Sequence, residues 1–395
     1  MKKYTYFFLI FVLFTIITPV HASEINTKSN NAVLYNLNDN MLLYEKNKDQ
    51  KVSIASLTKL MTALVAIENI DNLYEYVSFT KSDYEKLLIQ DASGSSLNKN
   101  KKYTYEDLLY GLILESGADC ANALARLTAG NETKFVKKMN EKAKELGMTN
   151  TSFANPIGLD DEKNYSTVQD VSILLKEDLK SPILNQIITS LTHKLTDGTT
   201  IHHTIYDYMK FFKTEIPTMK GGKTGYEIKS GYALASIASK NGTNLILVTS
   251  KGKNIGDHIK DAQMVYNYYF KNYDYQTIIK KNTTLVTLKT KYLSKKNIYI
   301  KANDDIKYYL KNNYNKKDIT TKYEGKNTVT LANKQYEKLG NLKIYYKNKL
   351  IMNYPIVLNQ KIYPNPIIIV SALSLLLIIL IIRLILSIKK AKLKQ

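Results

Sequence analysis

The chain of 395 residues contains a single cysteine, Cys120, so it can form no internal disulfide and must be stabilised by its hydrophobic core. Arginine is nearly absent, since only Arg126 and Arg383 occur among 56 basic residues. The histidines show no metal-ligand spacing with nearby carboxylates, which argues against a zinc hydrolase, and we expect no metal or other cofactor. Lysine, by contrast, is so common that a short motif containing it carries little weight alone.

Apolar segments lie near both ends of the chain. Residues 1–22 combine a short basic start, an apolar run and small residues ending at Ala22, which is typical of a secretory signal peptide. Residues 364–388 are long and apolar enough to cross a bilayer, and the basic tail 389–395 marks the cytoplasmic side. We therefore expect a single-pass protein of the cell membrane whose middle part is extracytoplasmic, and export argues against a nucleic-acid partner.

Composition divides the middle of the chain into two domains. Residues 23–272 mix strand patterns with apolar helices, whereas residues 273–362 are strand-like and rich in Lys, Asn, Thr and Tyr. We expect an α+β domain followed by a small all-β domain, which acts as a spacer from the membrane. In the first domain, hairpins are predicted around Asn38-Asp39-Asn40 and Asn241-Gly242. Helices are predicted over 108–127, with an interruption at Gly117, and over 135–146 and 257–269.

Ser56 belongs to the segment 54–66, around which the rest of the chain is organised and which is typical of the first turns of a buried helix. Lys59 follows three residues later and so shares one face of that helix with Ser56. A serine hydroxyl needs a base to become a nucleophile, and burial favours the uncharged lysine that can act as this base. The free backbone N–H groups at the helix start can stabilise an oxyanion.

Two later segments complete the pattern. Ser116 precedes the glycine that interrupts the predicted helix 108–127, and Lys220-Gly221-Gly222-Lys223-Thr224-Gly225-Tyr226 precedes the second hairpin. The glycines there let a substrate backbone lie against a strand edge. Either motif alone is compatible with an ordinary turn. Ser-x-x-Lys, Ser-Gly-x and Lys-Thr-Gly in this order are much harder to reach by chance.

With these motifs the sequence resembles the serine D-Ala-D-Ala carboxypeptidases among the low-molecular-mass penicillin-binding proteins. The resemblance extends to Asn-Pro-Ile-Gly-Leu at 155–159, Tyr165-Ser166-Thr167, the β domain and the membrane-attaching C-terminus. It implies a β-lactamase/transpeptidase-like catalytic domain, in which helices flank a five-stranded antiparallel sheet with Lys223-Thr224-Gly225 on an edge strand. It also implies peptidoglycan stem peptides ending in D-Ala-D-Ala as substrates, and β-lactam antibiotics as covalent inhibitors.

The resemblance gives each candidate residue a role. Ser56 attacks the carbonyl between the two terminal D-alanines, and neutral Lys59 takes its proton. Ser116 relays a proton to the leaving D-alanine, and water then hydrolyses the acyl-enzyme. The implied oxyanion site lies between the backbone N–H groups of Ser56 and Tyr226. The implied substrate-binding residues are Lys223, Thr224, Gly225 and Tyr226.

Two positions depart from the family pattern. Ala118 stands where the family often has an asparagine, so another group must orient Lys59 or the substrate, and Asn122 one turn later is a candidate. Many members also use an arginine after the Lys-Thr-Gly strand to hold the substrate carboxylate, and this chain has none there. We predict that His258 takes this role, since a histidine near a bound carboxylate gains a proton more readily and becomes a double donor. A structural histidine at a helix start is the alternative.

Two other functions stay open at this point. A β-lactamase would share the motifs, but it needs fast deacylation and gains nothing from a tethered spacer domain. A catalytically silent wall-binding protein would keep the fold, and Ala118 gives that alternative some support. The net charge of +21 suits anionic wall polymers or lipid headgroups, although compositional drift toward lysine throughout the chain explains it equally well.

Overall fold

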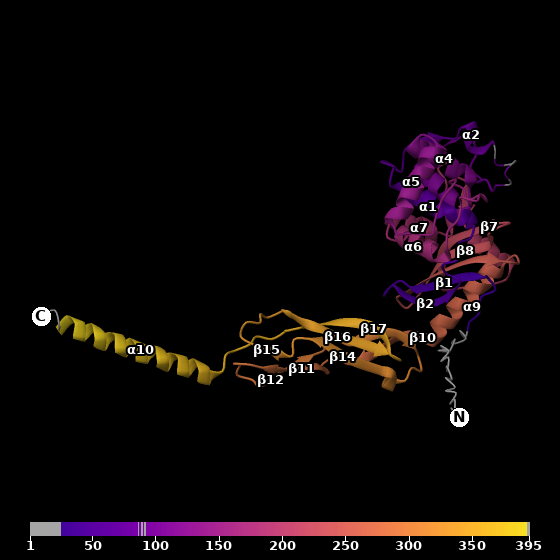
Figure 1. Ribbon diagram of the computed structural model, residues 1–395. Helices are drawn as coiled ribbons and strands as arrows, with labels where there is room; N and C mark the ends of the chain where they lie inside the picture. Colours follow the sequence, from indigo (N-terminus) through magenta and orange to yellow (C-terminus); the bar gives the residue numbers. More distant parts are fainter. Residues whose placement is uncertain (1–24, 86, 88–89, 91, 393–395) are drawn as a thin grey trace, which may run out of the picture. The chain divides into compact units, whose positions relative to one another are not determined.

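The computed structural model describes residues 25–85, 87, 90 and 92–392. The predicted signal peptide, residues 1–22, lies outside the described residues. The chain divides into two compact units, Met1–Phe270 and Lys271–Gln395, and Figure 1 shows their helices and strands with labels where there is room. The first unit is α+β, and the second contains a β domain and a C-terminal helix, as the sequence predicts.

A five-stranded sheet with the order β2-β1-β9-β8-β7 forms the centre of the first unit. Each of its pairings is antiparallel, which confirms the expected sheet and both predicted hairpins. The edge strand β7 contains Lys223-Thr224-Gly225, as expected. The strands are β1 (Asn31–Asn36), β2 (Met41–Lys46), β7 (Met219–Glu227), β8 (Gly231–Lys240) and β9 (Thr243–Gly252).

Successive side chains of a strand point to opposite faces of the sheet, and both faces are covered by helices. Ala235 of β8 and Val248 of β9 belong to a core that also contains buried residues of α1 and of α3 to α7. On the opposite face, Ser236 of β8 is hydrogen-bonded to Tyr266 of α9, with 2.9 Å between the two hydroxyl oxygens. The helices are α1 (Thr58–Ile67), α2 (Lys81–Tyr84), α3 (Tyr105–Leu114), α4 (Ala118–Ala129), α5 (Glu132–Glu145), α6 (Val168–Asp178), α7 (Pro182–Thr189), α8 (Thr204–Phe211) and α9 (Asp257–Asn272).

The predicted helices are present, and the predicted interruption at Gly117 separates α3 from α4. The first unit also contains two two-stranded sheets: β3 (Tyr76–Ser78) pairs with β4 (Lys102–Thr104), and β5 (Thr192–Lys194) pairs with β6 (Thr200–His202). These strands lie outside the central sheet.

The helix that follows Ser56 is buried along nearly its whole length. A single 3₁₀ turn, Ala55–Leu57, leads directly into α1, in which Thr58 to Ala66 are all buried. The segment 155–159 passes so close to this turn that a Cβ on Gly158 would lie 2.0 Å from the carbonyl oxygen of Ala55. Gly158 also has a φ of +91°, so only glycine fits this position without strain.

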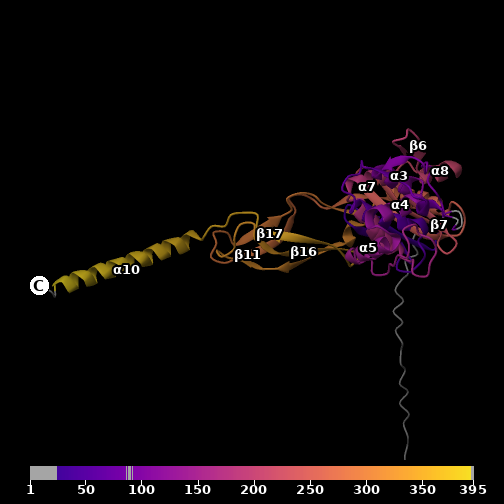
Figure 2. The same cartoon turned by 90° about the horizontal axis from the view of Figure 1, so that it is seen from above.

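The β domain of the second unit has its own hydrophobic core. Its sheets have the orders β10-β13, β12-β11-β15 and β14-β16-β17, and Figure 2 shows β16 beside β17. The strands are β10 (Tyr273–Ile279), β11 (Thr284–Thr290), β12 (Asn297–Lys301), β13 (Ile306–Lys311), β14 (Ile319–Gly325), β15 (Thr328–Val329), β16 (Lys338–Tyr346) and β17 (Lys349–Val357). The chain then forms α10 (Pro366–Lys392), in which Pro366–Lys390 is long and apolar enough to span a membrane.

Candidate active site

Ser56 and Lys59 lie in contact at the start of α1, as their spacing predicts. The Nζ atom of Lys59 is 2.8 Å from Oγ of Ser56 and 2.6 Å from the carbonyl oxygen of Ile157. Lys59 is only 2% exposed. Burial lowers its pKa to about 8, while the negative charges of Glu227 and Asp119 act in the opposite direction. About one Lys59 side chain in ten is therefore neutral at pH 7 and able to accept the proton of Ser56.

The Ile157 carbonyl is held in place by the segment 155–159. The Oδ1 atom of Asn155 accepts hydrogen bonds from the backbone N–H groups of Gly158 (2.7 Å) and Leu159 (3.1 Å). The hydroxyl of Thr62, one turn after Lys59 on α1, donates to the carbonyl of Pro156 at 2.6 Å. These bonds direct the next carbonyl, that of Ile157, toward Lys59. Sequence reasoning included the motif in the family resemblance but missed this contact.

Strand β7 runs beside the backbone of Ser56. A Cβ on Gly225 would lie 3.0 Å from the backbone nitrogen of Ser56, so a glycine permits this close approach. Lys223 is fully buried, and its Nζ donates to the carbonyl of Thr224 at 2.9 Å. The pKa of Lys223 is well below its usual value, mainly because the amine is buried and also because the charge of Lys59 repels its ammonium form. Tyr226 is 52% exposed and thus accessible to a ligand.

His203 and Thr204, which sequence reasoning did not select, support β7 from the start of α8. Nδ1 of His203 accepts a hydrogen bond from the N–H of Ile205 (3.2 Å), so Nε2 carries the proton and donates to the carbonyl of Gly222 (2.9 Å). His203 is fully buried, and burial together with the charge of Lys223 lowers its pKa to about 3. The hydroxyl oxygens of Thr204 and Thr224 are 3.2 Å apart. In the sequence, His202-His203 belongs to no motif, so nothing there predicted that His203 and Thr204 contact β7.

Ser116 lies in the junction between α3 and α4, with a φ of +64° and an exposed fraction of 9%. Within the described residues, no hydrogen bond joins it to Ser56 or Lys59, so its role as a proton relay stays a prediction.

Helix α4 packs against α1. Ala118 is fully buried, and Asn122 donates instead to the carbonyl of Asp83 at 3.0 Å. In the part of the chain that the structure describes, the group that orients Lys59 beside Ser56 is therefore the Ile157 carbonyl and not Asn122, whereas a role of Asn122 toward the substrate stays a prediction.

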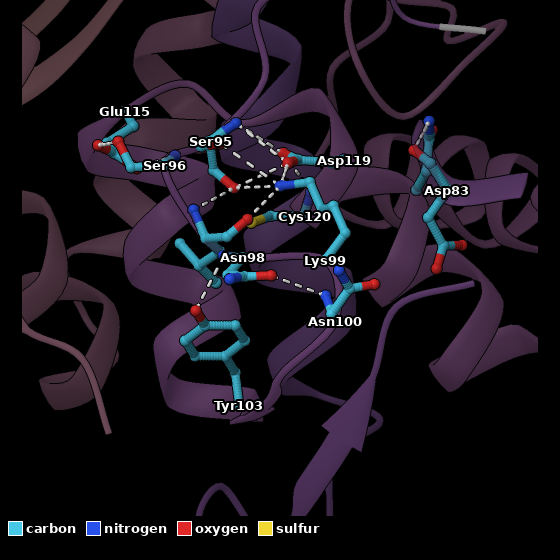
Figure 3. Close-up of polar contacts among 12 residues, drawn as sticks. Asp83, Ser95, Ser96, Asn98, Lys99, Asn100, Tyr103, Glu115, Asp119 and Cys120 are labelled. Atoms are coloured by element: carbon cyan, nitrogen blue, oxygen red, sulfur yellow. Dashed lines mark hydrogen bonds and ion pairs between the residues drawn. The ribbon is translucent and has the colours of Figure 1, made fainter. Parts of the chain in front are cut away.

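Asp119, in the first turn of α4, binds the segment 95–99 through Ser95 and Lys99 (Figure 3). Its carboxylate accepts hydrogen bonds from the N–H (3.0 Å) and the hydroxyl (2.8 Å) of Ser95, and it forms an ion pair with Lys99. Next to it, the N–H of Ser96 donates to Glu115 at 2.8 Å. Because Asp119 is fully buried, these partners compensate a charge that would otherwise be costly at this depth.

His258, the predicted carboxylate ligand, is the second residue of α9 and only 1% exposed. Its ring stacks on Tyr232, with centroids 5.6 Å apart, and meets the edge of Tyr208 at 5.0 Å. Burial lowers its pKa to about 4, so the ring is neutral near pH 7. In this structure the two tyrosines cover the ring, and its contact with a substrate carboxylate stays a prediction.

Arg126 cannot bind the substrate carboxylate because its guanidinium is paired with Asp83, at 2.8 and 2.9 Å.

We predict that His203→Gln weakens the acid sensitivity of folding. Unfolded His203 binds a proton below about pH 6.5, whereas the folded protein resists this until about pH 3. The stability that the neutral ring contributes is thus present above pH 6.5 and is lost as the pH falls toward 3. Glutamine does not titrate, so the loss of unfolding free energy between about pH 7 and about pH 5 should shrink by about 2 kcal/mol.

Denaturant unfolding of the detergent-solubilised full chain at both pH values measures this difference. His202→Gln is the matched control, because the neighbouring side chain is exposed. An equal pH dependence in the wild type and the His203 variant would contradict the assignment of a buried, neutral ring.

Two family models match the chain. The model described as D-alanyl-D-alanine carboxypeptidase matches residues 18–254, and that of the penicillin-binding protein 5 C-terminal domain matches residues 273–363. D-alanyl-D-alanine carboxypeptidase DacF of Bacillus subtilis is 28% identical over 338 residues, which cover 86% of this chain and 87% of that protein. A D-alanyl-D-alanine endopeptidase of Haemophilus influenzae is 34% identical over 206 residues, covering 52% of this chain and 68% of that protein.

Solved structures agree in fold over most of the chain. Penicillin binding protein 5 from Haemophilus influenzae has a TM-score of 0.68 at 22% identity, covering 86% of this chain and 98% of its own. D-alanyl-D-alanine carboxypeptidase DacD from Francisella tularensis has a TM-score of 0.68 at 20% identity, covering 86% and 95%. Since the first family model spans more than half of the sequence, this chain belongs to the D-alanyl-D-alanine carboxypeptidases, the serine hydrolases that act on peptidoglycan D-Ala-D-Ala ends and bind β-lactams.

Proposed function

We propose that Ser56 is the nucleophile of this carboxypeptidase and forms the acyl-enzyme during removal of the terminal D-alanine. The observation that carries this proposal is the 2.8 Å contact between Ser56 Oγ and the buried Nζ of Lys59. A lysine with a pKa of about 8 has a neutral fraction large enough to serve as a general base near neutral pH. The second hydrogen bond of Lys59, to the Ile157 carbonyl, orients the amine.

The reaction begins when Lys59 accepts the hydroxyl proton of Ser56 and Oγ attacks the carbonyl carbon of the penultimate D-alanine. The resulting oxyanion lies between the N–H groups of Ser56 and Tyr226, a pairing supported by the close approach of Gly225 to the Ser56 nitrogen. As the C–N bond breaks, Ser116 gives its proton to the nitrogen of the leaving D-alanine and regains one from Lys59, which becomes neutral again. Lys59 then takes a proton from the water that attacks the ester carbonyl and passes it to Oγ of Ser56 as the ester C–O bond breaks.

The edge strand β7 supports binding of the stem peptide as an additional strand, because among the described strands only β8 pairs with it. The terminal carboxylate would lie near Lys223 and the hydroxyls of Thr224 and Thr204. Burial depresses the pKa of Lys223, and an anionic carboxylate beside it would raise that pKa and favour the ammonium form. This arrangement supplies a charge and two hydroxyl donors without an arginine.

Ser56→Ala should abolish both labelling by fluorescent penicillin and release of D-alanine from a D-Ala-D-Ala peptide, while the protein stays folded. Ser53→Ala is the matched control, since Ser53 lies three residues earlier and binds Asp160; it should keep both activities. A penicilloyl adduct in the Ser56 variant would contradict the assignment. In the wild type, rapid turnover of penicillin would indicate a β-lactamase, and absence of both activities a silent wall-binding protein.

Lys59→Arg should slow acylation by about 10²–10⁴-fold, because arginine keeps its proton at every accessible pH. Wild-type acylation should rise about tenfold per pH unit below the pKa of about 8 and level off above it, since only the neutral amine accepts the proton. Stopped-flow penicillin binding measures both effects, and exposed Lys51→Arg is the control. A near-normal rate in Lys59→Arg would mean that another group takes the proton.

We also propose that α10 anchors the protein in the cell membrane, with the catalytic unit on the extracytoplasmic side. The candidate span Pro366–Lys390 supports the anchor, and the lysines at and beyond its end support a cytoplasmic C-terminus. The predicted cleavage after Ala22 would leave Ser23 as the first residue.

Protease added to intact protoplasts should therefore remove the penicillin-labelled unit and leave a membrane-bound fragment that contains α10. A cytoplasmic marker protein that stays intact is the control for lysis. A protected catalytic unit together with a digested C-terminal tail would contradict the proposed orientation.

A further inference from the structure

Positive charge is concentrated in the second unit. Residues 1–270 contain 31 lysines and arginines against 29 carboxylates, whereas residues 271–363 contain 20 lysines against 6 carboxylates. Compositional drift toward lysine would act on both parts of the chain. The contrast therefore shows that the excess of positive charge belongs to the β domain, so its cause must be sought in that domain.

The turn between β11 and β12, residues 291–296, is joined to the segment that leads into α10. Leu293 forms a β-bridge with Pro364. The N–H of Asn365 donates to the carbonyl of Tyr292 at 3.0 Å, and the N–H of Ser294 donates to the carbonyl of Tyr363 at 3.1 Å. Pro364 is two residues before the start of α10, so these bonds keep the turn next to the beginning of the candidate membrane span.

Four lysines surround this junction, and all four side chains are exposed: Lys291, Lys295, Lys296 and Lys361. Within the described part of the chain, none of them forms an ion pair with a carboxylate. The sequence has no Asp or Glu over residues 275–303 and none after Glu337. The lysines of the turn 291–296 and of the segment that leads into α10 therefore have no acidic residues near them in the sequence. We refer to the turn 291–296 together with Lys361 as the basic junction.

Two further features of the basic junction suit a lipid surface. Tyr292 and Tyr363 are 55% and 63% exposed, and tyrosine is enriched where a protein crosses from water into a bilayer. A cavity of about 100 Å³ is lined by Lys295 and Lys361 together with Gln360. Ammonium and amide N–H groups are donors that suit a phosphate group.

We propose that the basic junction binds the anionic phospholipid headgroups of the outer leaflet and so docks the β domain on the membrane. This inference rests on the proposed anchoring by α10. Electrostatic attraction extends about one Debye length, about 8 Å at physiological salt, and the bonded junction keeps the lysines close to the point where the chain enters the bilayer. Continuity with the span favours lipid over a wall polymer as the partner.

The full chain is reconstituted into nanodiscs of neutral phosphatidylcholine, or of phosphatidylcholine with about 30% phosphatidylglycerol. An environment-sensitive fluorophore is attached to Ser294→Cys, since the native Cys120 is buried and resists labelling. Emission should increase at least about twofold in the anionic discs, and about 0.5 M NaCl should reverse the increase. Changing the four lysines of the basic junction to glutamine should remove the response.

A second set of exposed lysines in the same domain provides the matched control: Lys307, Lys316, Lys317 and Lys347 changed to glutamine. This variant should keep the response, and penicillin labelling should be normal in both variants, which verifies the catalytic fold. Equal emission in the two kinds of disc, or a response that survives loss of the basic junction, overturns the inference. Emission that responds only to soluble poly(glycerol phosphate) also overturns it, in favour of a wall polymer. Failure of the chain to enter either disc contradicts instead the anchoring by α10.

Discussion

The burial of Lys59 is the constraint on which the rest of the active site depends. Removing an amine from water disfavours its charged form, and this brings the pKa of Lys59 to about 8. The neighbouring segments are arranged around that amine. The Ile157 carbonyl orients it, Ser56 is its partner in the reaction, and β7 lies against the same turn through Gly225. Burial makes the ammonium form of Lys59 a stronger acid, so more of the amine is neutral near pH 7 and able to accept the proton of Ser56.

The contacts that the sequence predicts are those set by local geometry. Ser56 and Lys59 meet because residues three apart share a helix face. The β1–β2 and β8–β9 hairpins follow from apolar residues on either side of short Asn-rich turns, and Gly117 separates α3 from α4. The antiparallel sheet and the edge position of β7 came from the family resemblance, because strand order depends on pairings between residues far apart in the chain.

The contacts that the sequence does not predict are made by backbone groups or depend on long-range packing. Ile157 acts through its carbonyl, which every residue type has, and it lies 98 positions from Lys59. The contact of His203 is also with a backbone group, the carbonyl of Gly222, and the sequence gives no sign of it. The sequence places His258 at the start of α9, but gives no sign that Tyr232 and Tyr208 cover its ring. Likewise, the sequence shows that the β domain is rich in lysine, but not that the basic junction forms beside the start of α10.

Direct titration of Lys59 tests the central claim. In the protein labelled with ¹³C at the lysine Cε atoms, the NMR signal that disappears in Lys59→Arg identifies this residue, and its chemical shift reports protonation as the pH is raised. The account predicts a midpoint near the pKa of about 8, well below the 10.5 of a solvated lysine. A midpoint at or above 10.5 would contradict it, because the amine would then be almost wholly charged at neutral pH and unable to take the proton of Ser56.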